Sequence, residues 1–117
     1  MAISVIKGLP PATETTMTND TTYVTGGTSY LRKKLGICAL SLAVKVSPFP
    51  SANTTYTIGT VPDSYKPKRT VSFVAQSINS ALTFLGQVGT NGEVSLASMG
   101  QVNTAGWING SATWIVE

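Results

Sequence analysis

The chain has 117 residues, a length that suits one domain with its own core and leaves no room for a second. Only 11% of the residues are charged and 42% are hydrophobic, which excludes a charged disordered tail, and no apolar run reaches the roughly 20 residues that span a membrane. The net charge of +3 favours anionic partners in general, but no basic stretch is interleaved with aromatic residues, so we expect neither nucleic-acid binding nor membrane insertion.

The first 30 residues differ in texture from the rest of the chain. The stretch "PPATETTMTNDTTYVTGGTSY" is dense in Thr, carries a Pro pair and a Gly pair, and shows no sustained apolar periodicity. We therefore predict an extended N-terminal arm over residues 1–30, with a short strand at 21–25, and a folded domain over residues 31–117. Two placements of the arm stay open: it lies on the body or on a neighbouring subunit, or it is a loose tail.

A long strand is predicted over residues 37–46. In "GICALSLAVKV" every second residue from Cys38 to Val46 is apolar, and this period of two is typical of a strand with one face on a core. A helix through Leu31, Leu35 and Cys38 is the alternative. It would place the run "RKK" in its first turn, where the helix dipole disfavours cations, so the strand is preferred. Cys38 is the only cysteine, which rules out an intrachain disulfide and suggests a small buried apolar residue.

Short strands and turns follow in alternation to the end of the chain. A proline-containing loop over 47–55 precedes a strand at 55–60, and the corner "PDSYKP" leads into a strand at 69–76. Asn91-Gly92 predicts a two-residue hairpin turn within 82–98, and Asn109-Gly110 predicts a second turn before the terminal run "SATWIVE". Seven or eight strands with frequent turns predict an all-β fold. We expect one antiparallel β-sandwich or barrel with Greek-key-like connections, in which the corner lets consecutive strands change sheets.

Few residues in the sequence are suited to catalysis. There is no histidine, and the single cysteine is too few for the usual zinc sites. A glycosidase would need two carboxylates across a cleft, and Asp63 with Glu93 is the pair to consider. Asp63, however, follows a proline in a turn, where Asp is common for its local backbone hydrogen bonds. We therefore predict a protein that is not an enzyme, with no catalytic residue, no metal and no cofactor.

The aromatic and basic residues remain as candidates for ligand binding. Trp114 falls on the apolar face of the last strand and is predicted to be core, whereas Trp107, beside Gly106, is the better candidate for stacking on a sugar ring. Tyr65 can add an edge to such a site or pack the corner against the barrel end. The corner also carries a cationic cluster suited to phosphate. The candidate ligand-binding residues are Trp107, Tyr65, Lys66, Lys68 and Arg69.

One pattern runs through residues 36–117: a strand enters a corner marked by Tyr and Pro, an apolar strand follows, and a hairpin precedes a final aromatic strand. Its residues are Gly59, Thr60, Val61, Pro62, Tyr65, Pro67, Val71, Phe73, Gly89, Asn91, Gly92, Val94 and Trp114. This pattern resembles the receptor-binding head domains found in tail-tip and baseplate proteins of long-tailed phages of Gram-positive bacteria, such as lactococcal phages. A small late-gene product of a Bacillus phage is a related interpretation.

The resemblance implies a protein of the virion, in the tail or baseplate, that takes part in host adsorption. Its partners would be other tail proteins and a saccharide or teichoic acid of the host cell wall, and it would be a homo-oligomer, with a trimer as one candidate. We see no signal peptide in "MAISVIKGLPP" and expect synthesis in the host cytoplasm. The alternative function is a structural or accessory virion component without a ligand.

Overall fold

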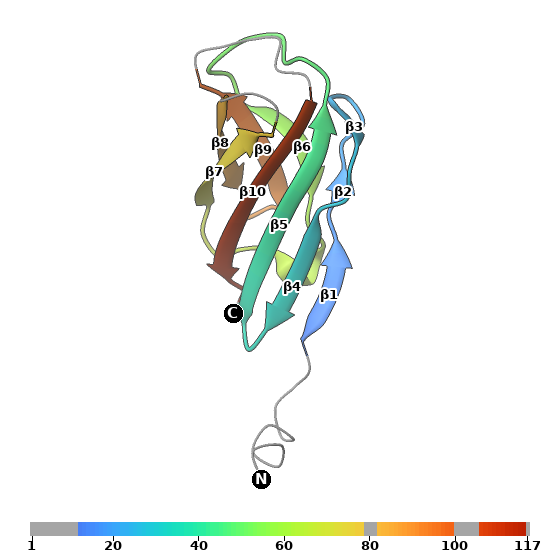
Figure 1. Ribbon diagram of the computed structural model, residues 1–117. Coiled ribbons are helices and arrows are strands. Elements are labelled where there is room, and N and C mark those ends of the chain that lie inside the picture. Colours follow the sequence, from blue (N-terminus) through green and yellow to red (C-terminus); the bar gives the residue numbers. More distant parts are fainter. Residues whose placement is uncertain (1–11, 79–81, 100–105, 117) are drawn as a thin grey trace.

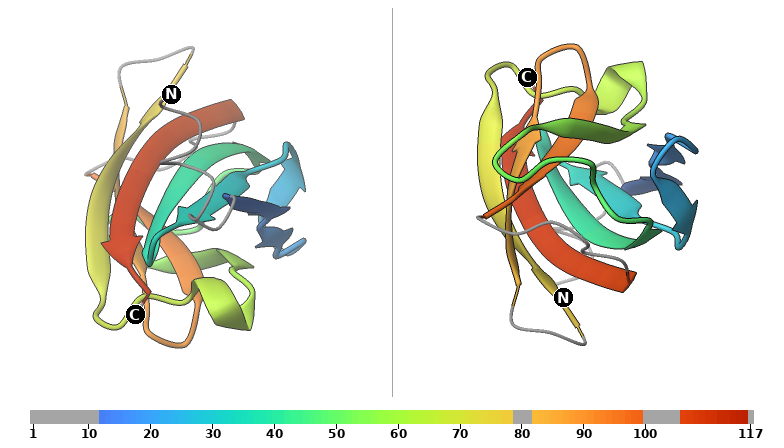
Figure 2. Two further views of the ribbon diagram at one scale, coloured as in Figure 1. Left: turned by 90° about the horizontal axis from the view of Figure 1, so that it is seen from below. Right: turned by 90° about the horizontal axis from the view of Figure 1, so that it is seen from above.

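In the part of the chain that the structure describes, ten antiparallel strands form one sheet that curls into a nearly closed barrel (Figures 1 and 2). The computed structural model describes residues 12–78, 82–99 and 106–116. Between the sixth and seventh strands lies one turn of 3-10 helix, η1, at Asp63–Tyr65. No helix in the described ranges has the length and apolar character needed to cross a membrane. The strands are β1 Thr13–Thr16, β2 Thr18–Asn19, β3 Val24–Gly26, β4 Tyr30–Lys34, β5 Ile37–Val46, β6 Tyr56–Thr60, β7 Val71–Ser77, β8 Thr83–Val88, β9 Glu93–Ser98 and β10 Gly106–Ile115.

The strand order confirms the predicted Greek-key connections. The sheet runs β1-β4-β5-β10-β7-β8-β9-β6-β2, and β3 pairs with β5 beside this path. Strands β7, β8 and β9 follow one another as antiparallel neighbours, and β10 then returns to lie beside β7. The spatial order β10-β7-β8-β9 is that of a Greek key, in which the fourth strand lies beside the first. The predicted all-β barrel is therefore confirmed.

The segment Thr13–Asn19, which we call the closing segment, joins the two edges of the sheet. Its first strand, β1, pairs with β4 at one edge, and its second, β2, pairs with β6 at the other. Between them Met17 turns its side chain into the core, while its backbone N–H donates to the carbonyl of Ser29 at 2.9 Å. The predicted arm over residues 1–30 thus contributes β1, β2 and β3 to the sheet, and its residues 1–11 lie outside the described part of the chain. The short strand expected at 21–25 is instead a turn over 21–23 followed by β3.

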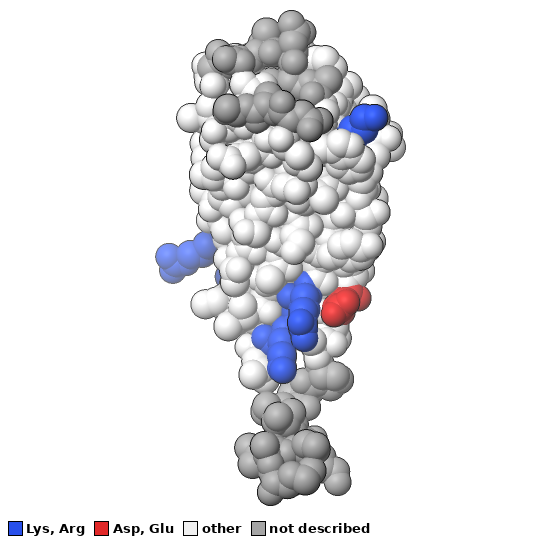
Figure 3. All heavy atoms as spheres, viewed as in Figure 1, with Lys and Arg blue, Asp and Glu red and all other residues white. Residues whose placement is uncertain are grey.

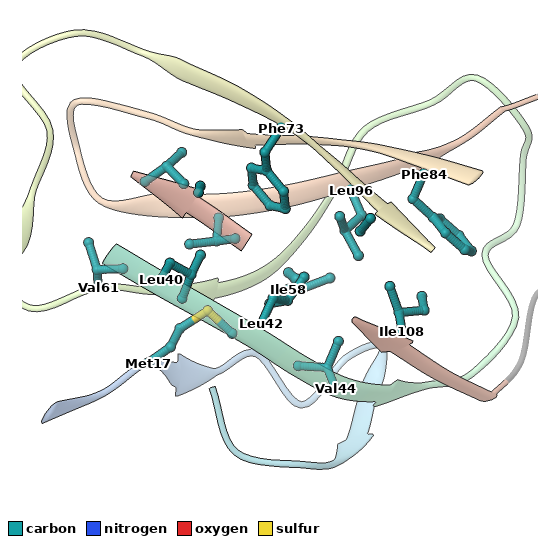
Figure 4. Close-up of a cluster of buried hydrophobic side chains, with 14 of the residues drawn as sticks. Met17, Leu40, Leu42, Val44, Ile58, Val61, Phe73, Phe84, Leu96 and Ile108 are labelled. Atoms are coloured by element: carbon teal, nitrogen blue, oxygen red, sulfur yellow. The ribbon is translucent and has the colours of Figure 1, made fainter. Parts of the chain in front are cut away.

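The core is built from alternate residues of the long strands. All five apolar positions predicted for β5, from Cys38 to Val46, are buried. So are the alternating positions of β8 and β9 and the two central ones of β7, Phe73 and Ala75, whereas Val71 is half-buried. Figure 4 shows Met17 pointing into the same cluster as Leu40, Leu42 and Val61. Burial raises the pKa of the Cys38 thiol from its ordinary value of 9.0 to about 11, against a smaller opposite effect of the Lys33 charge.

Two hairpin turns differ from the prediction in instructive ways. The β8–β9 hairpin is present, but its turn spans Gly89–Gly92, closed by the Gly92 N–H on the Gly89 carbonyl at 2.9 Å. Only Gly92 has a positive φ (90°), as in a turn that ends in a bulge. The β4–β5 hairpin was not predicted. Its two central residues, Leu35 and Gly36, have φ of 52° and 77°, as in a type I′ turn, and leucine seldom adopts that conformation.

The predicted turn at Asn109-Gly110 is wrong, because both residues lie inside the continuous strand β10. This strand pairs with β5 over ten residue pairs, from Gly106 with Val46 to Ile115 with Ile37. On its other side Gly110 lies opposite Ala75 of β7, so close that a Cβ on Gly110 would be 3.0 Å from the Ala75 Cβ. Glycine here serves the close approach of two strands rather than a turn.

Candidate functional site

The corner predicted from "PDSYKP" is fixed to the barrel end through Tyr65. The Tyr65 side chain is 7% exposed, and its hydroxyl lies 3.0 Å from the hydroxyl of Thr13 in the closing segment. Its backbone carbonyl accepts the indole N–H of Trp114 at 2.8 Å. Tyr65 therefore packs the corner against the barrel and presents little surface to a ligand. Trp114 is buried, as predicted.

Two cations near this corner, Lys66 and Lys33, already have partners within the protein. The Lys66 ammonium lies 2.7 Å from the Asp63 carboxylate, and hydrogen bonding and charge from Lys66 hold the pKa of Asp63 below its ordinary value. The Lys33 ammonium donates to the carbonyl of Ser64 at 2.8 Å and lies 4.6 Å from the centre of the Tyr65 ring. These contacts position the corner and leave Lys66 and Lys33 less able to recruit a ligand.

The next two cations line a pocket beside β10. Its volume is about 460 Å³, within the ~300–1,000 Å³ usual for small-ligand sites. Lys68 and Arg69 are exposed, and neither forms a salt bridge with any residue that the structure describes. The pocket thus joins two available positive charges to a mostly apolar lining. The residues lining it are Lys68, Arg69, Val71, Thr113, Trp114 and Ile115.

The pocket opens where two neighbouring strands diverge. Strand β10 pairs with β7 through three residue pairs only, ending at Gly110 with Ala75, whereas it pairs with β5 along its full length. Beyond that point the chain before β7 returns to β10 through a hydrogen bond from the Lys68 N–H to the Ile115 carbonyl at 3.3 Å. The pocket lies between these two contacts, and Ile115 is its exposed apolar residue, whereas Trp114 is 4% exposed and contributes little surface.

Trp107 lies far from these cations. It is 38% exposed and occupies the start of β10, opposite Lys45 of β5, whereas Ile115 ends the same strand. At roughly 3.3 Å per residue, the eight residues from Trp107 to Ile115 place the two about 26 Å apart. The structure therefore does not bring Trp107 into one site with Lys68 and Arg69, although the sequence grouped them.

Charged side chains gather toward one end of the molecule. In Figure 3 the Lys and Arg side chains lie mainly in the lower half of the view, and the broad face over β5 and β10 is almost free of charge. The outward residues of β5, β10 and β7 agree with this view, since Lys45 is the single charged residue among them. The pocket is therefore the place where positive charge meets an apolar surface. We call the face formed by these outward residues the uncharged wall.

Comparison with known proteins gives no assignment for this site. No protein-family model matches the chain, and no curated protein matches it. The resemblance to phage receptor-binding heads therefore stays a prediction from the sequence.

The sequence suggested only part of this pocket. Lys68 and Arg69 were predicted from the cationic corner, but Val71, Thr113, Trp114 and Ile115 were not linked to them. The alternation of side chains along β10 indicated which of its residues face outward. No feature of the local sequence, however, shows that β7 and β10 diverge. Among the described residues, no group of three His, Cys, Asp or Glu side chains is placed to hold a metal ion.

Proposed function

We propose that this chain is a binding domain of a phage tail or baseplate, similar to receptor-binding heads, and that it recognises an anionic polymer of the host cell surface. A teichoic acid, in which phosphate groups alternate with polyol or sugar units, is the ligand class we favour. The observation that supports this proposal best is the pocket, where Lys68 and Arg69 stand beside the apolar surface of Ile115 and Val71.

The lining matches the two chemical parts of such a polymer. A phosphate accepts charge-assisted hydrogen bonds, and arginine is suited to donate two in parallel. The C–H faces of a sugar or polyol pack on apolar surface, which the exposed Ile115 and the half-buried Val71 supply. Because both cations are exposed, each contact contributes only about 1 kcal/mol and weakens with salt.

A binding role fits the pocket better than hydrolysis. The two carboxylates that a glycosidase would use are not part of its lining, and Asp63 is held by Lys66. The sequence has no histidine to act as a general base. We therefore propose a non-catalytic adsorption function in the virion, with other tail proteins as its structural partners.

The test is binding of fluorescently labelled protein to purified Gram-positive cell walls before and after the teichoic acid is removed. The double variant Lys68→Glu/Arg69→Glu should bind at least tenfold more weakly, since two contacts of ~1 kcal/mol are replaced by repulsion. Lys45→Glu makes the same change in net charge as either single substitution, at an exposed residue outside the pocket lining, and it should bind like the wild type.

Two results would count against the proposal. One is equal binding by the wild type to intact and stripped walls. The other is full affinity in the Lys68→Glu/Arg69→Glu variant with a normal thermal unfolding curve. Either would show that the pocket does not recognise the anionic polymer.

The uncharged wall favours a second candidate function, that of a structural virion component. Small or neutral side chains such as Ala39, Ser41 and Ser111 face outward there, so copies of a cationic protein would meet without charge repulsion. A homo-oligomer, including a trimer, would use such a face. Light scattering that finds a stable oligomer, together with no binding to any wall preparation, would favour this second function over the first.

A further inference from the structure

A row of four exposed residues crosses the sheet at the end that carries the pocket. Lys34 of β4 pairs with Ile37 of β5, and Ile37 pairs with Ile115 of β10. The Ile115 carbonyl then accepts the backbone N–H of Lys68. All four residues are exposed, with Ile37 at 51% and Ile115 at 61%.

This row places a second cation at a defined distance from the pocket. Neighbouring strands lie ~4.8 Å apart, so three steps separate the backbones of Lys34 and Lys68 by about 14 Å. Within this row the apolar side chains of Ile37 and Ile115 lie between the two cations. Since Ile115 and Lys68 also line the pocket, the row continues the pocket across β10 and β5.

Lys34 is the available cation of its strand. Arg32 lies 4.0 Å from the Glu14 carboxylate, and Lys33 is held by Ser64 and the Tyr65 ring. Lys34, by contrast, is exposed and forms no salt bridge within residues 12–78, 82–99 and 106–116. A ligand that reaches across Ile37 would therefore meet a charge that is not already neutralised.

We propose that Lys34 forms a second anion subsite, so that the site binds two anionic groups of one polymer while the intervening C–H segment lies on Ile37 and Ile115. This inference rests on the proposed function and specifies its ligand as a chain with repeated phosphates. Two linked contacts strengthen binding because the second becomes intramolecular once the first has formed.

A polyol phosphate fits this row better than a single-stranded nucleic acid does. Single-stranded nucleic acids are usually held by aromatic side chains on which successive bases stack. The side chains between the two cations of the row are aliphatic. Tyr65 is buried beneath the corner, and Trp107 lies at the other end of β10. An extended polymer of alternating phosphate and polyol needs only the cations and the aliphatic surface.

The experiment measures the affinity for glycerol phosphate and for oligo(glycerol phosphate) chains of two, four and eight units. The proteins are the wild type, Lys34→Gln, Lys68→Gln, and Lys45→Gln as the matched control at the far end of β5. For the wild type we expect affinity to rise with chain length. Lys34→Gln should keep the wild-type affinity for the monomer and lose about fivefold of the gain with length, corresponding to one exposed charge contact of ~1 kcal/mol.

The outcomes separate the two proposals. If no probe binds the wild type, the proposed function falls and this inference with it. If Lys68→Gln weakens monomer binding but Lys34→Gln keeps the full gain with length, the pocket stands and the second subsite is overturned. Tighter binding of a single-stranded oligonucleotide of equal charge, lost in Lys34→Gln, would overturn the choice of polyol phosphate. Equal thermal unfolding curves for the variants confirm that they fold alike.

Discussion

Met17 should be the residue on which closure of the barrel depends. Met17 lies between β1 and β2, and its side chain is buried, with 5% exposed. The residues on either side of it, Thr16 and Thr18, face solvent. Its Sδ and Cε pack directly over Gly59, since a Cβ built there would lie 2.7 and 2.5 Å from those atoms. Replacing Met17 with alanine therefore empties a space between the closing segment and β6.

The expected cost follows from the atoms removed. Met17→Ala removes three heavy atoms from the core, and at ~0.8 kcal/mol for each methylene-sized group the lost transfer free energy is about 2.4 kcal/mol. The cavity adds to this, because buried Met→Ala changes cost ~2–5 kcal/mol in total. We expect a loss of about 3 kcal/mol in the free energy of unfolding, a large share of the ~5–15 kcal/mol typical of a domain.

Urea unfolding of Met17→Ala, with Thr16→Ala and Thr18→Ala as controls, measures this loss. The exposed controls should change stability by no more than ~0.5 kcal/mol. Amide exchange adds a local test, because the Met17 N–H bonds to Ser29 and the Asp20 N–H bonds to Ile58, each at 2.9 Å. Both amides should exchange faster in Met17→Ala. A loss below about 1 kcal/mol, the middle of the usual range for point mutants, would show that the closing segment does not depend on Met17.

Two further predictions concern Leu35 and Cys38. Leu35→Asn should stabilise the protein by about 1 kcal/mol, because asparagine adopts the positive φ of this turn more readily than leucine; an unchanged or lower melting temperature would contradict this. Between pH 9.0 and about 11 the Cys38 thiol ionises in the unfolded chain but stays protonated in the folded one, so stability should fall as pH rises. Because the slope approaches ~1.36 kcal/mol per pH unit only between the two pKa values, the wild type should lose about 2 kcal/mol more than Cys38→Ala over this range. Parallel pH profiles of the two proteins in urea unfolding would refute it.

The sequence predicted the elements whose signal is local. The alternation of apolar residues in β5 identified its buried face. The corner after β6 was predicted from its prolines, and the β8–β9 hairpin from Asn91-Gly92. The closing segment was not predicted as part of the wall, because Met17 is its only deeply buried residue and one apolar residue makes no pattern. The β4–β5 turn was missed because Leu35 replaces the Asn or Gly that such a turn normally carries.

The two Asn-Gly pairs show where local reasoning ends. Asn91-Gly92 lies in a turn because β8 and β9 are adjacent in the chain and pair with each other. Asn109-Gly110 lies within a strand because β10 is held between β5 and β7, both distant in sequence. The wrongly predicted turn also explains why Trp107 was grouped with Lys68 and Arg69. A turn at 109–110 would have folded Trp107 back toward the last strand, whereas the continuous β10 places it at the end of the strand opposite to the pocket.

The position of β10 between β5 and β7 also has a consequence for synthesis. The β5–β10 pairs join residues as far apart as Ile37 and Ile115, and such non-local pairing slows folding. At ~5–20 residues per second, some 60 residues are made between the end of β5 and the start of β10, which takes about 3–12 s. During that time one edge of β5 has no strand to pair with, and its apolar row from Cys38 to Val46 lacks the cover of Ile108, Ala112 and Trp114. The nascent chain is therefore most prone to aggregate just before its last strand arrives.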